Sequence, residues 1–154
     1  SDTYPISAYY RILLPDLIPK QLKKLIYLDA DLVVTGDLEQ LWKLDMGDYY
    51  ALAVQDICHQ YVSQTSHLNR PEFGIPADQK YFNTGVLLID LEKWRNHQIT
   101  QKTLDFLETH SDCIRFADQD ALNITLAGKL GELDPRWNQI HEIYNYRFWQ
   151  ESPY

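Results

Sequence analysis

Two aspartates separated by one residue follow a short apolar run. Residues 25–28 are strand formers, and Asp29 and Asp31 come directly after them. In an extended segment, side chains two residues apart project to the same face, about 6.6 Å apart along the chain. Both carboxylates can therefore bind one cation, and their oxygens suit hard ions such as magnesium or manganese. The pair also lies where α/β proteins bind ligands, beyond the carboxyl end of a strand.

An Asp-x-Asp pair after a buried strand is compatible with three kinds of protein. In haloacid-dehalogenase-like phosphatases the first Asp attacks phosphorus, and residues 29–33 satisfy their short pattern with Asp29 as the nucleophile. In metal-dependent glycosyltransferases both Asp residues instead hold a cation on a nucleotide diphosphate. A non-catalytic sugar-binding or structural module is the third interpretation. The motif alone leaves all three open.

Apolar runs rich in β-formers predict the strands that would position such a site. They are residues 25–28, 49–54 and 82–90, with Val33 and Val34 resuming strand character after the acid pair. Residues 56–78 show no periodicity and predict a long surface loop, and loops of that length are commonly functional. The acid pair would therefore lie beside a sheet of at least three strands.

Four segments carry helix signals, either a capping residue or apolar residues at helical spacing. They are residues 8–14 between Ser7 and Pro15, residues 38–42 after Asp37, residues 90–110, and a helix that opens at Asp118 and ends at Gly128. Strands alternating with helices predict an α/β fold with a mostly parallel sheet. We expect one domain over residues 1–154.

Composition excludes several classes of protein. The chain has 154 residues with 45% hydrophobic content, enough for one compact core. A net charge of −8 argues against a nucleic-acid partner, since such surfaces need an excess of Lys and Arg. Two cysteines fit a reducing cytoplasm. We see neither a signal peptide nor an apolar run of the roughly 20 residues that a transmembrane segment needs.

Three separated segments together resemble glycosyltransferase family 8. They occur in family order and are SAYYR (7–11) with LIYLDADLVV (25–34), YFNTGVLLIDL (81–91) with Trp94 and Arg95, and DQDALN (118–123). The match runs from about Ser7 to Trp137. Because order and spacing agree across the three segments, the resemblance is far more specific than any one motif, and it favours the glycosyltransferase interpretation.

The resemblance implies a GT-A fold and a retaining hexosyltransferase, similar to the bacterial enzymes of lipopolysaccharide biosynthesis. Such an enzyme moves galactose or glucose from a UDP-sugar donor to a saccharide acceptor, here lipopolysaccharide or another cell-surface glycan. The implied cofactor is Mn²⁺ or Mg²⁺. A cytoplasmic location follows, with peripheral association of the full-length protein at the inner membrane face left open.

The resemblance also implies roles for individual residues. Asp29 and Asp31 would bind the metal, and Asp118 and Gln119 would serve catalysis, with Gln119 near the anomeric carbon. The substrate-binding residues would be Arg11, Asp29, Ala30, Asp31, Asn83, Thr84, Gly85, Asp118 and Gln119. Purely structural roles are the alternatives at three of these positions. Arg11 could be a solvated helix charge, residues 83–85 a bend at a strand start, and Asp118 a helix cap.

The chain departs from the family pattern near both ends. The family begins with a strand and helix that hold the nucleobase and ribose, and no such segment precedes Ser1. It ends with a His-x-x-Gly-x-x-Lys-Pro-Trp segment, which residues 141–144 do not match. We therefore expect a partial catalytic domain, truncated at both ends, that alone neither binds donor well nor turns it over.

Overall fold

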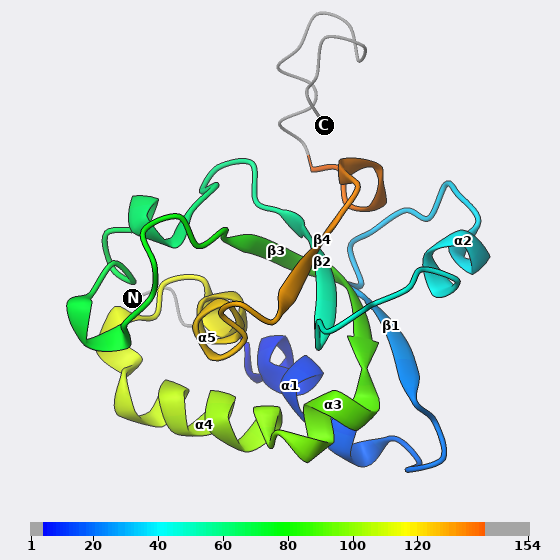
Figure 1. The fold of residues 1–154 in the computed structure, drawn as a ribbon, viewed down its shortest axis with the longest axis horizontal. Helices are drawn as coiled ribbons and strands as arrows, with labels where there is room; N and C mark the ends of the chain where they lie inside the picture. Colours follow the sequence, from blue (N-terminus) through cyan, green and yellow to red (C-terminus); the bar gives the residue numbers. More distant parts are fainter. Residues whose placement is uncertain (1–4, 141–154) are drawn as a thin grey trace, which may run out of the picture.

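The computed structural model in Figure 1 describes residues 5–140. Its strands form one sheet in the order β1-β3-β2-β4. They are Lys24–Leu28 (β1), Ala51–Gln55 (β2), Phe82–Asp90 (β3) and Leu130–Leu133 (β4). β3 runs antiparallel to both β1 and β2, whereas β2 and β4 are parallel. The segment at 141–144, where we expected a departure from the family, lies outside the described residues.

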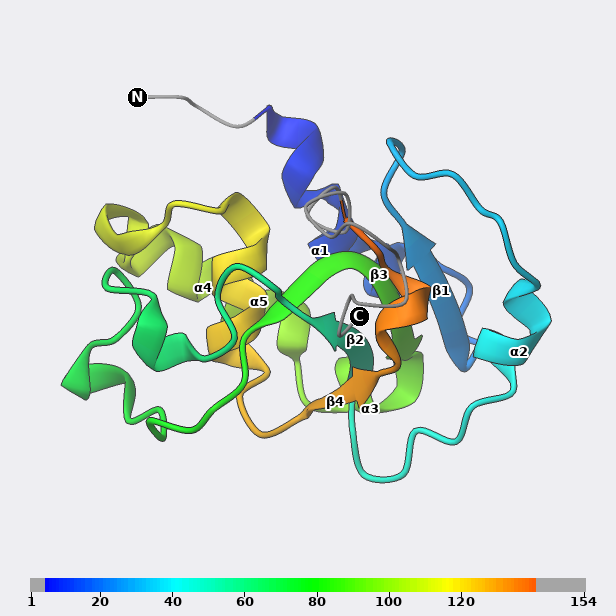
Figure 2. The ribbon, with the colours of Figure 1, turned by 90° about the horizontal axis from the view of Figure 1, so that it is seen from above.

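Helices lie on both faces of the sheet, as Figures 1 and 2 show. They are Tyr10–Leu17 (α1), Leu38–Trp42 (α2), Leu91–Asn96 (α3), Ile99–Thr109 (α4) and Ala117–Thr125 (α5). α1, α3, α4 and α5 lie on one side, and α2 lies on the other. Among residues 5–140, no helix combines the length and the apolar character that crossing a bilayer requires.

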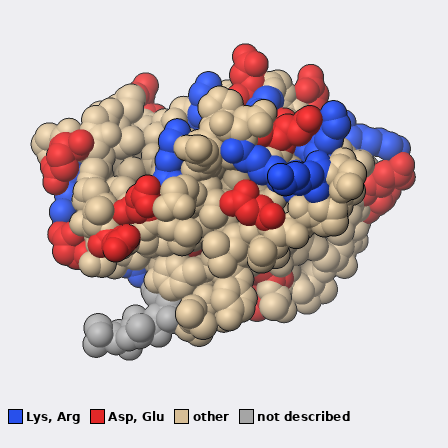
Figure 3. Space-filling model, turned by 90° about the horizontal axis from the view of Figure 1, so that it is seen from below, with Lys and Arg blue, Asp and Glu red and all other residues tan. Residues whose placement is uncertain are grey.

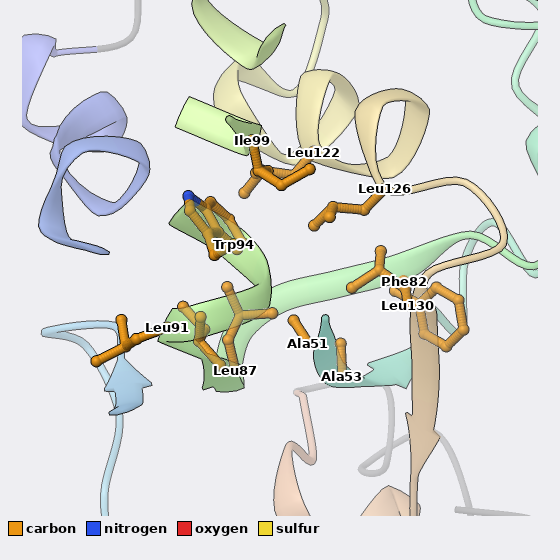
Figure 4. Packing of buried hydrophobic residues seen from close by; sticks show 11 residues of the cluster. Ala51, Ala53, Phe82, Leu87, Leu91, Trp94, Ile99, Leu122, Leu126 and Leu130 are labelled. Atoms are coloured by element: carbon orange, nitrogen blue, oxygen red, sulfur yellow. The ribbon is translucent and has the colours of Figure 1, made fainter. Parts of the chain in front are cut away.

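Alternating side chains of the central strands build a core on each face of the sheet. Ala51, Ala53 and Leu87 pack towards α3, α4 and α5, together with Trp94 and Leu122 (Figure 4). Their sequence neighbours face the other way, against α2 and the segment before β2. These residues are Leu52, Val54, Val86, Leu88, Leu41 and Met46. Because successive strand residues point to opposite faces, two apolar layers fix the register of β2 and β3.

The α/β fold is confirmed, but the sheet is mixed where a mostly parallel one was expected. The predicted strands at 25–28, 49–54 and 82–90 correspond to β1, β2 and β3. The long predicted loop joins β2 to β3 with only two short 3-10 turns, Val62–Gln64 and Pro71–Phe73. A loop without a crossover helix returns the chain antiparallel, which periodicity in the separate strands does not reveal.

The predictions for two helices were wrong. α1 continues through Pro15 to Leu17, and Arg95 donates hydrogen bonds to the carbonyls of Pro15 (2.6 Å) and Ile18 (2.8 Å) at its end. Side-chain donors thus satisfy carbonyls that the helix leaves open. The predicted helix over 90–110 is two helices, because Gln98 adopts φ +55° between α3 and α4.

Val33 and Val34 were also predicted wrongly, since they form no strand within the described residues. Their exposed fractions are 85% and 53%. The predicted cap at Asp37 is confirmed, because its carboxylate accepts from the Glu39 N–H at 2.9 Å. Residues 29–37 are therefore an irregular connection between β1 and α2, with a turn at residues 30–31.

The surface carries interspersed charges. On the face in Figure 3, Lys and Arg side chains form a band with Asp and Glu beside it. Exposed ion pairs of the molecule include Lys23 to Glu92 at 3.3 Å and Lys43 to Glu39 at 2.6 Å. Exposed pairs of this kind add little stability, about 0–1 kcal/mol each, so the core determines the fold.

Candidate functional site

The end of β1 meets the beginning of β3. Leu28 is paired with Val86, and the Asp29 N–H donates to the Gly85 carbonyl at 2.9 Å. Because the two strands are antiparallel, the carboxyl end of one lies beside the amino-terminal half of the other. The acid pair predicted after β1 therefore lies next to the Asn83–Thr84–Gly85 segment.

α5 is fixed over the same part of β3 by Asn123. The Asn123 carboxamide accepts from the Phe82 N–H at 2.7 Å and donates to the Phe82 carbonyl at 2.8 Å. It thus pairs with β3 as another strand would. One turn earlier in α5, Gln119 Oε1 accepts from the Thr84 N–H at 3.1 Å. Asn123 therefore fixes the position of α5 along β3, and with it the positions of Asp118 and Gln119.

Arg11 on α1 joins these segments. Its side chain is 10% exposed, with Nε 2.6 Å from Asp118 Oδ2 and one terminal nitrogen 2.9 Å from Asp29 Oδ1. The other donates to the Thr84 carbonyl at 2.5 Å. The guanidinium also lies over the Tyr27 ring, 4.7 Å from its centroid. Arg11 is therefore a buried hub between the acid pair, β3 and α5, rather than a solvated helix charge.

Asp118 is the most perturbed carboxyl group of this cluster. Burial raises its pKa to about 6, although the Arg11 charge acts in the opposite direction. Asp118 does not cap α5, because the N-cap is Phe116, without a side-chain cap bond. Ala117, between them, adopts φ +49°, a region that β-carbon-bearing residues seldom occupy. Local strain and a buried charge together mark this helix start as a candidate site.

Tyr27 holds the Asp29 carboxylate through a hydrogen bond. Its hydroxyl donates to Asp29 Oδ1 at 2.7 Å, and burial, followed by this hydrogen bond, raises the Tyr27 pKa to about 12. Arg11 contacts the same oxygen. Within residues 5–140 the polar contacts of Asp29 thus fall on Oδ1, which leaves Oδ2 turned towards Gly85 and available to a ligand.

Asn83 and Gly85 form a tight polar corner. Asn83 Oδ1 accepts from the Gly85 N–H at 2.9 Å and from the Asn138 side chain at 2.8 Å. A β-carbon at Gly85 would lie 3.1 Å from Asn83 Oδ1 and 3.2 Å from Asp29 Oδ2. The β2–β3 register shifts here, between Ala53 and Val54, so the segment is also the predicted bend. The bend brings the backbone close to the acid pair.

Asp31 is exposed, as is Ala30 between the two aspartates. Asp31 lines a cleft of about 750 Å³ between the segment after β1 and residues 136–140. Apolar side chains form much of its wall, including Leu28, Leu32 and Val86. Ala30 has no side chain beyond its methyl group, so its contribution to a ligand would come from the backbone.

The acid pair fits a hard divalent cation in part. Two carboxylates next to a cleft suit magnesium or manganese, which usually bind one or two protein carboxylates and keep water or phosphate oxygens as further ligands. No cluster of three or more His, Cys, Asp or Glu within residues 5–140 could hold a metal. An ion at Asp29 and Asp31 would therefore complete its shell with water, phosphate or residues outside that range.

Sequence reasoning missed several residues that complete the cluster. Buried Asp56 directs Oδ2 towards the side-chain nitrogens of Asn83 and Gln119, each at 3.5 Å. The Tyr81 hydroxyl accepts from the Gln119 side chain and donates to Asp120, the next residue of α5. Asp56 opens the predicted loop directly after β2, a position that could have identified it. Asn138 is distant in sequence from the other segments and carries no comparable signal.

Residues 1–152 match the family model described as glycosyl transferase family 8. The chain is 41% identical over 135 residues to general stress protein A of Bacillus subtilis, covering 86% of this chain and 45% of that protein. It is 34% identical over 137 residues to lipopolysaccharide 1,2-glucosyltransferase of Escherichia coli K12, covering 89% of this chain and 39% of the relative.

Solved structures show the same fold. Galactosyltransferase LgtC, in complex with donor and acceptor sugar analogs, superimposes with a TM-score of 0.79 at 32% identity, over 97% of this chain and 52% of that one. Glycosyltransferase GlyE of Streptococcus pneumoniae TIGR4 gives 0.69 at 32% identity, over 94% and 32%. The fold is thus the GT-A fold. The chain spans about half the length of these relatives, or less.

Proposed function

Because this chain belongs to glycosyl transferase family 8, we propose that the protein carrying it transfers a hexose, galactose or glucose, from a UDP-sugar to a saccharide acceptor. Residues 1–154 would be part of a single catalytic domain. The names of a lipopolysaccharide glucosyltransferase relative and of the LgtC galactosyltransferase favour lipopolysaccharide or another cell-surface glycan as acceptor. A cytoplasmic protein working at the inner membrane face would meet such acceptors.

One observation carries this proposal: Arg11 contacts Asp29, Thr84 and Asp118 at the same time. Asp29, the β3 corner and the start of α5 therefore meet around the Arg11 side chain. A nucleotide diphosphate beside Asp29 would extend its sugar towards Asn83, Thr84 and Gly85. Asp118 would accept hydrogen bonds from sugar hydroxyls, and the cationic Arg11 would offset the negative charge of donor and carboxylates.

Gln119 would act at the anomeric carbon. A neutral carboxamide is a weak nucleophile, so we assign it polar stabilisation of an oxocarbenium-like state rather than a covalent intermediate. The bond from the anomeric carbon to the diphosphate oxygen breaks, and the acceptor hydroxyl bonds to that carbon from the same face. Its proton passes to the departing diphosphate. The anomeric configuration is thereby retained.

Asp29 and Asp31 would hold Mn²⁺ or Mg²⁺. When bound, such an ion supplies Lewis-acid stabilisation of the charge that develops on the diphosphate, a contribution of several kcal/mol. The residues of this chain would position it: Asp29 is fixed by Tyr27 and Arg11, while Asp31 faces the cleft.

Turnover of UDP-glucose and UDP-galactose by the full-length protein, with Mn²⁺ or with a chelator, tests this function. Asp31→Ala should lower the rate on the order of a hundredfold, the loss expected for a charge-stabilising group. Asp16→Ala, at an exposed position on α1, is the matched control and should match the parent protein. Activity of Asp31→Ala within about threefold of the parent would refute the assignment.

Two other outcomes identify the alternatives. Binding of UDP and manganese by calorimetry without any turnover would indicate a non-catalytic sugar-binding module. Phosphate release from phosphomonoesters through an aspartyl-phosphate on Asp29 would indicate a phosphatase. Membership of the transferase family and the two contacts that hold Asp29 Oδ1 favour neither of them.

A further inference from the structure

A buried tyrosine stands directly behind Gln119. Tyr81 immediately precedes β3, and its side chain is fully buried. The Tyr81 hydroxyl donates to Asp120 Oδ1 at 2.7 Å. The Tyr81 hydroxyl oxygen also accepts from Gln119 Nε2 at 3.2 Å. Tyr81 therefore links the side chains of two successive residues of α5, one in the core and one in the candidate site.

Asp120 is a fixed anchor for this link. Its other oxygen, Oδ2, accepts from the N–H groups of Arg115 and Phe116, each at 2.8 Å, and lies 3.1 Å from His67 Nε2. Asp120 is fully buried, and with four polar contacts its carboxylate has no freedom to rotate. Burial, and then the Asp120 charge, raises the pKa of Tyr81 well above its usual range, so the phenol keeps its proton.

These contacts determine which way the Gln119 carboxamide points. The Tyr81 hydroxyl has a single proton, which it donates to Asp120, so the Tyr81 oxygen is left to accept from Gln119. On its other side, the Thr84 N–H can only donate, and it faces Gln119 Oε1 at 3.1 Å. The nitrogen is thus held towards Tyr81 in the core and the oxygen towards β3.

The orientation leaves Gln119 with a defined capacity for a ligand. Its two N–H groups face the Tyr81 oxygen at 3.2 Å and Asp56 Oδ2 at 3.5 Å. Within the described chain Oε1 accepts one hydrogen bond, from Thr84, and a carbonyl oxygen has two lone pairs. One lone pair of Oε1 therefore remains for a partial positive charge, whereas a flipped amide would present N–H groups that repel it.

We propose that Tyr81 is a positioning residue for the transfer reaction, which holds the Gln119 carboxamide with its oxygen towards the donor sugar. The inference rests on the proposed function of Gln119. Tyr81 itself would touch neither donor nor acceptor, because its hydroxyl is occupied on both sides by Asp120 and Gln119. Its removal should therefore change the rate of the chemical step more than the affinity for donor.

A double-mutant cycle tests this role in the full-length protein. Tyr81→Phe keeps the ring and removes only the hydroxyl; we expect kcat to fall about tenfold with the donor KM within about twofold. In a Gln119→Ala background the same substitution should change kcat by less than about twofold, since residues that act as a unit are not additive. Tyr49→Phe, at a 45% exposed position, is the control. Equal losses in both backgrounds would overturn the proposal.

A second readout does not depend on activity. The side-chain amide signals of Gln119 can be identified in ¹⁵N spectra by their loss in Gln119→Ala. Tyr81→Phe should shift these signals and speed their hydrogen exchange at least tenfold, while Tyr49→Phe leaves them unchanged. Unchanged signals in Tyr81→Phe would overturn the positioning role even if the protein proved to have no transferase activity. Absent turnover with the expected shifts would instead count against the proposed function alone.

Discussion

Arg11 on α1 and Asp118 on α5 form a buried ion pair, with Nε and Oδ2 2.6 Å apart and side-chain exposures of 10% and 3%. The two residues are more than a hundred positions apart in sequence, yet both helices direct them at the beginning of β3. Such a pair contributes little net stability compared with apolar packing, but breaking it leaves an uncompensated buried charge. Its position therefore points to function.

Removing the cation of this pair should be costly. Arg11→Met leaves the Asp118 carboxylate buried without its partner, and we expect a loss of about 3–5 kcal/mol in the free energy of unfolding. Arg136→Met removes an exposed arginine that lies 3.8 Å from Asp134, and should cost less than about 1 kcal/mol. Urea unfolding measures both. Similar losses in the two variants would show that Arg11 is not a buried hub.

The raised pKa of Asp118 predicts a pH-dependent stability. Its folded value of about 6 exceeds the model value of 3.8, so between these values the folded protein binds more protons than the unfolded chain. The contribution of Asp118 to the free energy of unfolding therefore falls as pH rises through this window, by roughly 3 kcal/mol in total. Relative to Asp118→Asn, the parent protein should lose stability from about pH 4 to 6.5, as measured by urea unfolding. A pH-independent difference would contradict the shift.

The corner at Gly85 should not tolerate a side chain without loss of binding. A β-carbon there would crowd the side-chain oxygens of Asn83 and Asp29 at 3.1 and 3.2 Å. We expect Gly85→Ala to weaken binding of UDP with Mn²⁺ about tenfold or more, as measured by calorimetry. Gly74→Ala is the control, because a β-carbon at Gly74 meets nothing within 4 Å and Gly74 does not line the cleft. Equal affinity in both variants would remove Gly85 from the site.

Gly131 on β4 should matter for folding alone. A β-carbon there would lie 2.5 Å from Leu52 Cδ2 and 2.5 Å from Tyr49 Cδ2. Overpacking of this kind typically costs 1–3 kcal/mol, so thermal unfolding of Gly131→Ala should begin at lower temperature. Below that transition its affinity for UDP and Mn²⁺ should equal that of the parent protein. An unchanged midpoint would show that the sheet relaxes to admit the methyl group.

Local pattern was enough to predict three of the four strands, because apolar runs identified β1, β2 and β3. The family resemblance, and not local pattern, implied Arg11, Asp29, Asn83 and Gln119 as site residues, and their roles stay a prediction. The direction of β3 could not be predicted, because a strand looks the same in sequence whichever way it runs. The break between α3 and α4 could not be predicted either, because the apolar spacing continues through Gln98, which has a left-handed backbone.

Residues that act through long-range contacts were the ones missed. Tyr81 begins a segment that carries the family resemblance and Asp56 opens a predicted loop, but only the fold brings these residues and Asn138 to Gln119 and Asn83. Asp118 was expected to open its helix and to bind sugar, and its buried partner on α1 was not foreseen. Pairings over such separations are a property of packing, which periodicity does not encode.

The most direct measurement is a crystal structure of the full-length protein with manganese and a non-hydrolysable UDP-hexose, with the metal located by its anomalous scattering. The anomalous peak should lie in contact with Asp29 Oδ2 and Asp31, and the hexose should extend past Asn83 with its anomeric carbon facing Gln119 Oε1. A metal bound elsewhere, or a sugar directed away from Arg11 and Gln119, would contradict a shared metal and donor site.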